Sequence, residues 1–284
     1  MIRQRTVKDP VTVEGIGLQT GKPATVTLVS APESSGISFI RTDLPNKPLL
    51  DINSLVFDGK SGSLERRTVI GRGPFQIQTI EHLMAALSGL SIDNITIELD
   101  SEELPGLDGS ASGFVDAIKR AGITEQNKAR SVLEITEPVW CGGKSGDGFI
   151  AVFPDDDFRV SYTLSYPGRI GTQFLSVGPD IHGDFFEREI APARTFCMEE
   201  EAEKLLKMGL GKGANYDNTL VMGPSGPIKT ALRFPDEPVR HKILDLIGDL
   251  YLLGVQIKGH VVAIKSGHRL NMELVSKIKG EKHG

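Results

Sequence analysis

The sequence is short of three features, and each shortage argues against a class of protein. Its two cysteines, Cys141 and Cys197, are too few for a disulfide framework or a cysteine-rich zinc site, so we interpret each as a small, at least half-buried side chain. No apolar run reaches about 18 residues and the N-terminal stretch has no signal-peptide core, so we expect a cytoplasmic protein without a membrane span. Basic residues are outnumbered, giving a net charge of −5, which argues against a general nucleic-acid binder.

The chain nevertheless has ample material for a folded core. Of its 284 residues, 39% are hydrophobic and 24% are charged, which is typical of a soluble globular protein. This length allows one large domain or two ordinary ones.

The first half of the chain is predicted to be strand-rich, with two helices near its end. Runs rich in Val, Thr and Ile, separated by Gly, Pro, Asn and Asp turns, predict strands over residues 6–13, 24–30, 36–42, 67–70 and 94–100. Helices are predicted over 79–90, with Thr79 as N-cap, and over 111–121. The polar, aperiodic residues 124–131 are predicted to form a linker.

After this linker the same order of elements begins again. Strands are predicted over 132–137, 149–153, 158–164, 172–177 and 259–265. Helices over 238–253 and 270–279 lie on either side of the last strand. Both halves therefore have strands followed by helix, strand and helix, which predicts an α+β fold of two similar domains, residues 1–127 and 128–284.

The second half carries an extra segment over about 171–213. Within it, a helix is predicted over 199–208, and its Ala202, Leu205 and Leu206 form an apolar stripe. From the sequence alone, this stripe is most simply explained by packing onto the domain.

The helix predicted over 238–253 has an unusual polar face. His241 and Asp245 lie one helical turn apart, a spacing that suits two ligands of one metal ion. Asp249 follows one turn later and could orient a neighbour, while Lys242 adds a positive charge. The alternative is that these charges are only the solvated face of an amphipathic helix. A metal site would need a third ligand from elsewhere.

The first half offers that ligand. His82 lies at the start of its first helix, as His241 does in the second half, so packing of the halves about a pseudo-two-fold axis would bring the two histidines together. Two histidines and one aspartate with an open fourth position form the pattern of catalytic zinc. Glu81 would then suit a general base, the alternative being a carboxylate that complements the helix dipole. His268 could protonate a leaving amine, although a loop histidine is more often a surface residue.

Several long motifs, in one order along nearly the whole chain, resemble those of a known family. They are EGIGLQTG (14–21), TIEHLMAAL (79–87), LPGLDGSA (104–111), APARTF (191–196), LRFPDEPVRHKILDLIGDLYLLG (232–254) and SGHRLN (266–271). Together they resemble the UDP-3-O-acyl-N-acetylglucosamine deacetylases, the zinc amidases of lipid A biosynthesis. The resemblance implies two β-α-α-β sandwich domains related by a pseudo-two-fold axis, with the active site at their interface. It also implies a UDP-linked acylated amino-sugar substrate, hydrolysed to acetate and a free 2-amine.

The resemblance implies a role for each polar residue of the site. Zinc would be held by His82, His241 and Asp245. Glu81 would deprotonate the attacking water, and His268, kept cationic by Asp249, would protonate the glucosamine nitrogen. Thr195 would donate its hydroxyl to the oxyanion, with the charge of Lys242 beside it. Two histidines and a carboxylate can also hold Fe²⁺, so both metals stay open.

The family also uses its second-domain insert as a hydrophobic passage for the 3-O-acyl chain. The residues that would line it here are Phe196, Ala202, Leu205 and Tyr216. Ser165 and Tyr166 stand where the family's Asp-Phe pair is expected, which leaves an aromatic stack on uracil but no carboxylate contact. We expect a monomer.

Two alternatives remain open from the sequence. One is a zinc amidase acting on another N-acetylated sugar, which would share the chemistry and differ in the binding pocket. The other is a non-catalytic binding protein with a structural metal, although such a site prefers four protein ligands and needs neither acid nor base.

Overall fold

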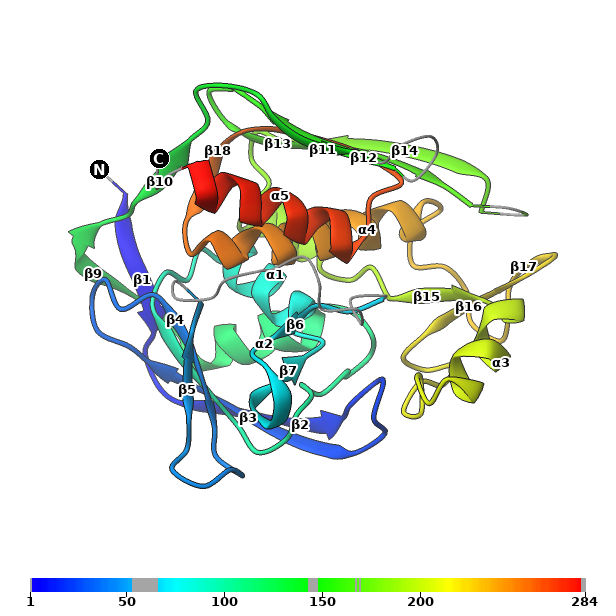
Figure 1. Cartoon of the computed structure of the whole chain (residues 1–284), viewed down its shortest axis with the longest axis horizontal. Helices are drawn as coiled ribbons and strands as arrows, with labels where there is room; N and C mark the ends of the chain where they lie inside the picture. Colours follow the sequence, from blue (N-terminus) through cyan, green and yellow to red (C-terminus); the bar gives the residue numbers. More distant parts are fainter. Residues whose placement is uncertain (1, 53–65, 143–147, 167, 169, 282–284) are drawn as a thin grey trace.

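The computed structural model describes residues 2–52, 66–142, 148–166, 168 and 170–281. Two sheets form the outer layers and the long helices lie between them, as Figure 1 shows. The sequence of layers is sheet, helices, helices, sheet, so the predicted α+β class is confirmed. In the described parts of the chain, no helix has the length and apolar character needed to cross a bilayer.

The two sheets have the same topology. The first consists, in spatial order, of β2 (Val11–Ile16), β3 (Pro23–Ser30), β8 (Ile95–Leu99), β4 (Ile37–Arg41) and β5 (Leu49–Asp51). The second consists of β11 (Val139–Gly142), β12 (Phe149–Phe153), β18 (Gln256–Ile264), β13 (Phe158–Ser165) and β14 (Thr172–Val177), with β10 (Val132–Glu134) also paired to β18.

Strand directions match as well as strand order. In each sheet the last strand in sequence, β8 or β18, lies in the middle, antiparallel to one neighbour and parallel to the other. The outer pairs are antiparallel in both sheets. The duplication predicted from the order of elements is therefore confirmed as a repeated topology, whereas the pseudo-two-fold axis and the domain boundary near residue 127 stay predictions.

Each half contributes two main helices to the interior. The first half supplies α1 (Glu81–Gly89) and α2 (Ser112–Ala121), and the second supplies α4 (Glu237–Leu250) and α5 (His268–Glu281). α1 and α4 pack directly against each other at the centre of the molecule. The apolar residues of both halves merge into one core, so the start of α1 is held beside the middle of α4.

The surroundings of α4 decide between the two interpretations of its polar face. Every residue of this helix is buried except Arg240 and Lys242, which are half-buried. The solvated-face alternative is therefore wrong. Buried carboxylates and imidazoles need partners, because burial without one carries a large desolvation cost.

Three local predictions were wrong. Residues 124–131 are not a linker, because β9 (Ile123–Ala129) pairs antiparallel with β1 (Arg3–Val7). Most of β9 is exposed on both faces, so no apolar alternation marks it in the sequence. The strand predicted over 6–13 is divided between β1 and β2. Thr79 does not cap α1, because its hydroxyl donates to Glu103 at 2.9 Å.

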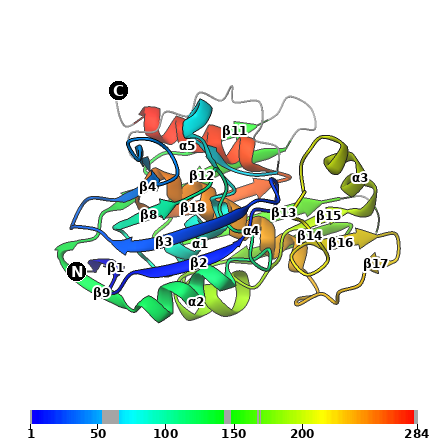
Figure 2. The same ribbon diagram turned by 90° about the horizontal axis from the view of Figure 1, so that it is seen from below.

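A small substructure stands apart at one end of the molecule, on the right in Figures 1 and 2. It contains α3 (Glu199–Lys207) and a sheet of β15 (Phe196–Met198), β16 (Leu220–Gly223) and β17 (Gly226–Pro227). Of the predicted extra segment, residues 172–177 instead belong to the second sheet as β14. The remaining short elements are β6 (Val69–Ile70), β7 (Ile77–Gln78), η2 (Gly73–Phe75), η3 (Phe186–Ile190) and η4 (Tyr251–Leu253).

Candidate active site

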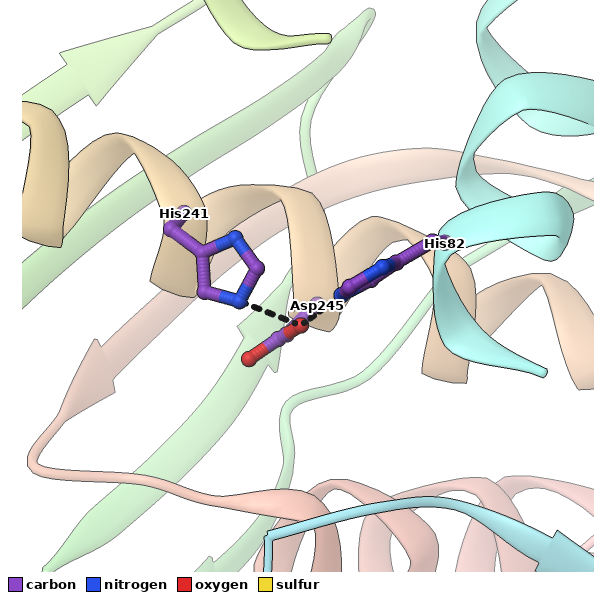
Figure 3. Close-up of side chains that lie close together, drawn as sticks. All are labelled: His82, His241 and Asp245. Carbon is purple, nitrogen blue, oxygen red and sulfur yellow. Dashed lines mark ion pairs between the residues drawn. The ribbon is translucent and has the colours of Figure 1, made fainter. Parts of the chain in front are cut away.

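The three predicted metal ligands meet at the contact between α1 and α4. Asp245 Oδ1 lies 3.3 Å from His241 Nε2 and 3.7 Å from His82 Nε2. One ligand atom from each residue can be chosen so that all lie within 4.8 Å of one another, and all of these side chains are buried. Figure 3 shows the two imidazoles converging on the carboxylate from separate helices. The packing of the two halves therefore brings His82, the predicted third ligand, to the other two.

A loop from the second half fixes the orientation of His241. Its Nδ1 lies 3.0 Å from the carbonyl oxygen of Ala193, which can only accept, so Nδ1 carries the proton and Nε2 presents its lone pair to Asp245. The next residue, Arg194, forms a buried ion pair with Glu237 at the start of α4, with Nε and Oε1 2.8 Å apart. This ion pair anchors the loop that carries both Ala193 and Thr195.

Burial sets the protonation states of the cluster. It lowers the pKa of His82 to about 3, with His241 adding to the effect, and it also lowers the pKa of His241. Burial would raise the pKa of Asp245, but His241 and Lys242 outweigh this and hold it well below its usual range. Lys242 Nζ lies 2.7 Å from Asp245 Oδ2, whereas His82 and His241 approach Oδ1. Two neutral imidazoles and an ionised carboxylate are the forms that bind a metal.

Glu81 lies beside this cluster, at the first position of α1. Burial raises the pKa of its carboxyl to about 7, with His268 opposing the rise and Asp245 adding to it. Its Oε2 accepts a hydrogen bond from the backbone N–H of Thr68 at 3.0 Å. A buried carboxyl with a pKa near neutrality suits a general base better than a solvated group that complements the helix dipole.

His268 faces Glu81 across the site. It is the first residue of α5 and is buried, so the surface-residue alternative is wrong. Its Nδ1 lies 2.8 Å from Asp249 Oδ2, and its Nε2 lies 3.9 Å from Glu81 Oε1. Burial would lower the pKa of His268, but Asp249 and Asp245 raise it to about 9. The imidazole is therefore cationic at neutral pH, as a general acid must be.

A cavity of about 410 Å³ joins the cluster to the small substructure. It is lined by Glu81, His82, His241, Lys242, Asp245 and His268. It is also lined by Phe196, Ala202, Leu205, Leu206 and Tyr216, which include all of the predicted passage residues, together with the charged Arg66, Glu199 and Glu203. The ring of Phe196 lies next to the cluster, with its centroid 6.3 Å from that of His241. Thr195 and Tyr166 also line it, whereas Asp249 is buried behind His268.

The apolar stripe of α3 lines this cavity and does not join the main core. No residue of α3 is buried, so Ala202, Leu205 and Leu206 do not pack into a core. They form part of the cavity wall. α3 also packs against β15 and β16 of the small substructure, so packing and cavity lining both contribute, and the passage stays a prediction.

Sequence reasoning missed two residues of the site, Thr68 and Asn271. Both contact Asp249: the Thr68 hydroxyl donates to Oδ1, and Asn271 Nδ2 donates to Oδ2 at 2.8 Å. Asn271 could have been found, because it lies three residues after His268 on a helix and so shares its face. Thr68 lies 181 residues from Asp249 along the chain, and no local pattern marks it.

Comparison with known proteins places the chain in a family. The sequence model of the LpxC family, described as UDP-3-O-acyl N-acetylglycosamine deacetylase, matches residues 4–280. The chain belongs to this family. The resemblance carried by the motifs is thus confirmed, and the chain is a deacetylase, a hydrolase that acts on an amide. The alternative of a non-catalytic binding protein is wrong.

Relatives from three bacteria match the chain almost from end to end. All are named UDP-3-O-acyl-N-acetylglucosamine deacetylase. The protein of Chlamydia abortus is 42% identical over 278 residues, covering 97% of this chain and 96% of its own. That of Anaeromyxobacter is 41% identical over 97% of this chain and 88% of its own, and that of Trichormus variabilis is 38% identical over 98% of both.

Proposed function

We propose that this deacetylase removes the N-acetyl group of UDP-3-O-acyl-N-acetylglucosamine, releasing acetate and the free 2-amine, as an early step of lipid A biosynthesis. One observation carries the proposal. A candidate base and a candidate acid, Glu81 and His268, lie beside a cluster of three candidate ligands in a cavity whose wall also carries the apolar side chains of the small substructure. This arrangement fits an amide next to a long acyl chain. The cytoplasmic location and the monomeric state stay predictions.

The donor set fits Zn²⁺. Two neutral imidazole nitrogens and one carboxylate oxygen converge in a buried pocket, and the proton of His241 is held on the ring nitrogen that faces away. Among the residues that the structure describes, this is the one group identified as able to hold a metal. When bound there, zinc would polarise the amide carbonyl and increase the acidity of the attacking water. Two histidines and one carboxylate can also hold Fe²⁺, and metal analysis distinguishes the two ions.

The remaining chemistry is assigned to the chain's own side chains. Glu81 takes a proton from the water whose oxygen attacks the amide carbon. The Thr195 hydroxyl and the Lys242 ammonium stabilise the negative charge that develops on the carbonyl oxygen. His268 then donates its Nε2 proton to the amide nitrogen as the C–N bond breaks, while Asp249 keeps the ring oriented through Nδ1. The products are acetate and the amine.

The 3-O-acyl chain is assigned to the apolar side chains of the cavity wall. Phe196, Ala202, Leu205 and Tyr216 offer a hydrocarbon surface that would be buried on binding, worth about 25 cal/mol per Å². Tyr166 lines the same cavity and makes an edge-on contact with Phe196, with ring centroids 5.4 Å apart. The Tyr166 ring is therefore assigned to the cavity wall that faces the substrate.

Acetate release from UDP-3-O-acyl-N-acetylglucosamine tests the proposal. The protein is assayed as purified, after treatment with a chelator and after zinc is restored, with UDP-N-acetylglucosamine as a matched substrate that lacks the acyl chain. Activity that disappears with the chelator, returns with zinc and depends on the acyl chain supports reaction, cofactor and passage together. Equal activity on both substrates would instead favour an amidase for another N-acetylated sugar.

A further inference from the structure

Thr68 contacts both halves of the proposed acid–base pair. It immediately precedes β6 and is completely buried. Its backbone N–H donates to Glu81 Oε2 at 3.0 Å, and its hydroxyl donates to Asp249 Oδ1. Its carbonyl oxygen accepts from the backbone N–H of Thr79 at 2.9 Å, just before α1. All of its polar groups are thus engaged, which fixes the residue in one orientation.

The hydroxyl of Thr68 completes the surroundings of the Asp249 carboxylate. Oδ2 accepts from His268 Nδ1 and from Asn271 Nδ2, each at 2.8 Å. Oδ1 accepts from Thr68, and Asp249 itself has no exposed surface. A buried carboxylate oxygen without a donor is costly. Removing the hydroxyl would therefore favour rotation of the carboxylate and loss of its alignment with His268.

The same hydroxyl also faces the imidazole. Thr68 Oγ1 lies 3.1 Å from His268 Nδ1, and a hydroxyl can donate one hydrogen bond while it offers its lone pairs elsewhere. When the Thr68 hydroxyl donates its hydrogen bond to Asp249, the lone pairs of Oγ1 face the Nδ1–H of His268. Thr68 and Asp249 together therefore hold the ring plane, with Nε2 directed to the site.

We propose that Thr68 is a positioning residue that holds the acid and the base in one fixed geometry. Its backbone holds one oxygen of Glu81 and leaves the other facing His268 Nε2 at 3.9 Å. Its hydroxyl holds the carboxylate that orients His268. The inference rests on the roles proposed above for Glu81 and His268.

A pair of substitutions isolates the hydroxyl. Thr68→Val keeps the shape and the backbone N–H but removes the hydroxyl, whereas Thr68→Ser keeps the hydroxyl and removes a methyl group. Loss of a hydrogen bond to a charged group should lower kcat of Thr68→Val by about tenfold to a hundredfold, with KM changed by less than about twofold. Thr68→Ser should keep kcat within about threefold of the unmodified protein. Bound metal should be unchanged in both, because the hydrogen bonds described for Thr68 are made to Glu81, Asp249 and His268 and not to the candidate ligands.

Thr6→Val is the matched control. Thr6 is also buried, and its hydroxyl accepts a hydrogen bond from the backbone N–H of Ala31 at 3.2 Å, away from the cavity. The Thr6→Val variant should have a lower thermal midpoint of unfolding and an unchanged kcat. If Thr68→Val fails to fold, Thr68→Ala removes the same hydroxyl and is compared with Thr68→Ser in the same way.

A double-mutant cycle with Asp249→Asn tests whether Thr68 acts through that carboxylate. We expect Thr68→Val to lower kcat in the unmodified protein but to add little in the Asp249→Asn background. If Thr68→Val lowered kcat by the same factor in the Asp249→Asn protein as in the unmodified protein, the proposal would be overturned. Equal kcat for Thr68→Val and the unmodified protein, or equal losses for the valine and serine variants, would also overturn it. Absence of acetate release from the unmodified protein would contradict the proposed function instead.

Discussion

Gly248 lies directly against the backbone of Glu81. A Cβ at position 248 would stand 2.0 Å from the Glu81 carbonyl oxygen, which is closer than any real contact. The absence of a side chain at this position of α4 therefore allows α1 to approach closely enough to bring Glu81 and His82 to Asp245. The candidate active site depends on this close approach of two helices from different halves of the chain.

We expect Gly248→Ala to damage both the fold and the site. The added methyl group must push the start of α1 away from α4, at a cost of about 1–3 kcal/mol in the free energy of unfolding. The same displacement separates His82 from its partners, so zinc affinity should fall. Gly280→Ala is the control, because a Cβ there meets nothing within 4 Å. Urea unfolding and metal analysis check the result, and an unchanged metal affinity for Gly248→Ala would contradict it.

Removal of the candidate base should separate metal binding from turnover. Glu81→Gln keeps the size of the side chain but cannot accept the proton of water. Because a general base contributes about a hundredfold to ten-thousandfold in rate, kcat should fall by that range while zinc content is retained. Single-turnover acetate release and metal analysis on the same sample check this. A variant with near-normal kcat would rule out Glu81 as the base.

The activity should have a bell-shaped dependence on pH. Glu81 acts when deprotonated, so kcat/KM should rise with pH through its pKa of about 7. His268 acts when protonated, so kcat/KM should fall as pH passes its pKa of about 9. His268→Gln should lower the rate and remove only the falling limb. If that limb survives in the variant, the acid is another group.

Loss of one ligand should weaken metal binding specifically. His82→Ala leaves one histidine and one carboxylate in the cluster, so zinc should be lost on dialysis against a weak chelator. His260→Ala is the matched control, because this half-buried histidine lies on β18 and bonds Ser161 at 2.8 Å. Zinc content per chain is the measurement. Equal zinc in the two variants would remove His82 from the ligand set.

Narrowing the cavity should affect long acyl chains most. Ala202→Trp introduces a large side chain into the wall, so KM should rise for a long-chain substrate and change little for a short-chain one. Lys204→Trp is the control, since Lys204 lies on the same helix, is exposed and does not line the cavity. A parallel rise of KM for both chain lengths would place the acyl chain elsewhere.

Much of the fold could be predicted because its signals are local. Helical periodicity identified α4 and put His241 and Asp245 on one face, and the order of elements predicted the repeated topology. β9 was missed for the opposite reason. Its side chains are mostly exposed on both faces, so its pairing with β1 left no apolar pattern.

The sequence by itself determined the candidate ligands on α4, their helical spacing and the family, because each of these is encoded in neighbouring residues or in long motifs. Only the tertiary structure decided that α4 is buried on both faces, that His82 completes the cluster and that Thr68 contacts Asp249. It also decided the pKa values of Glu81 and His268, since burial and the charges around them come from separate elements. The physical reason is that backbone geometry acts over one helical turn, whereas desolvation and packing act between residues that folding brings together.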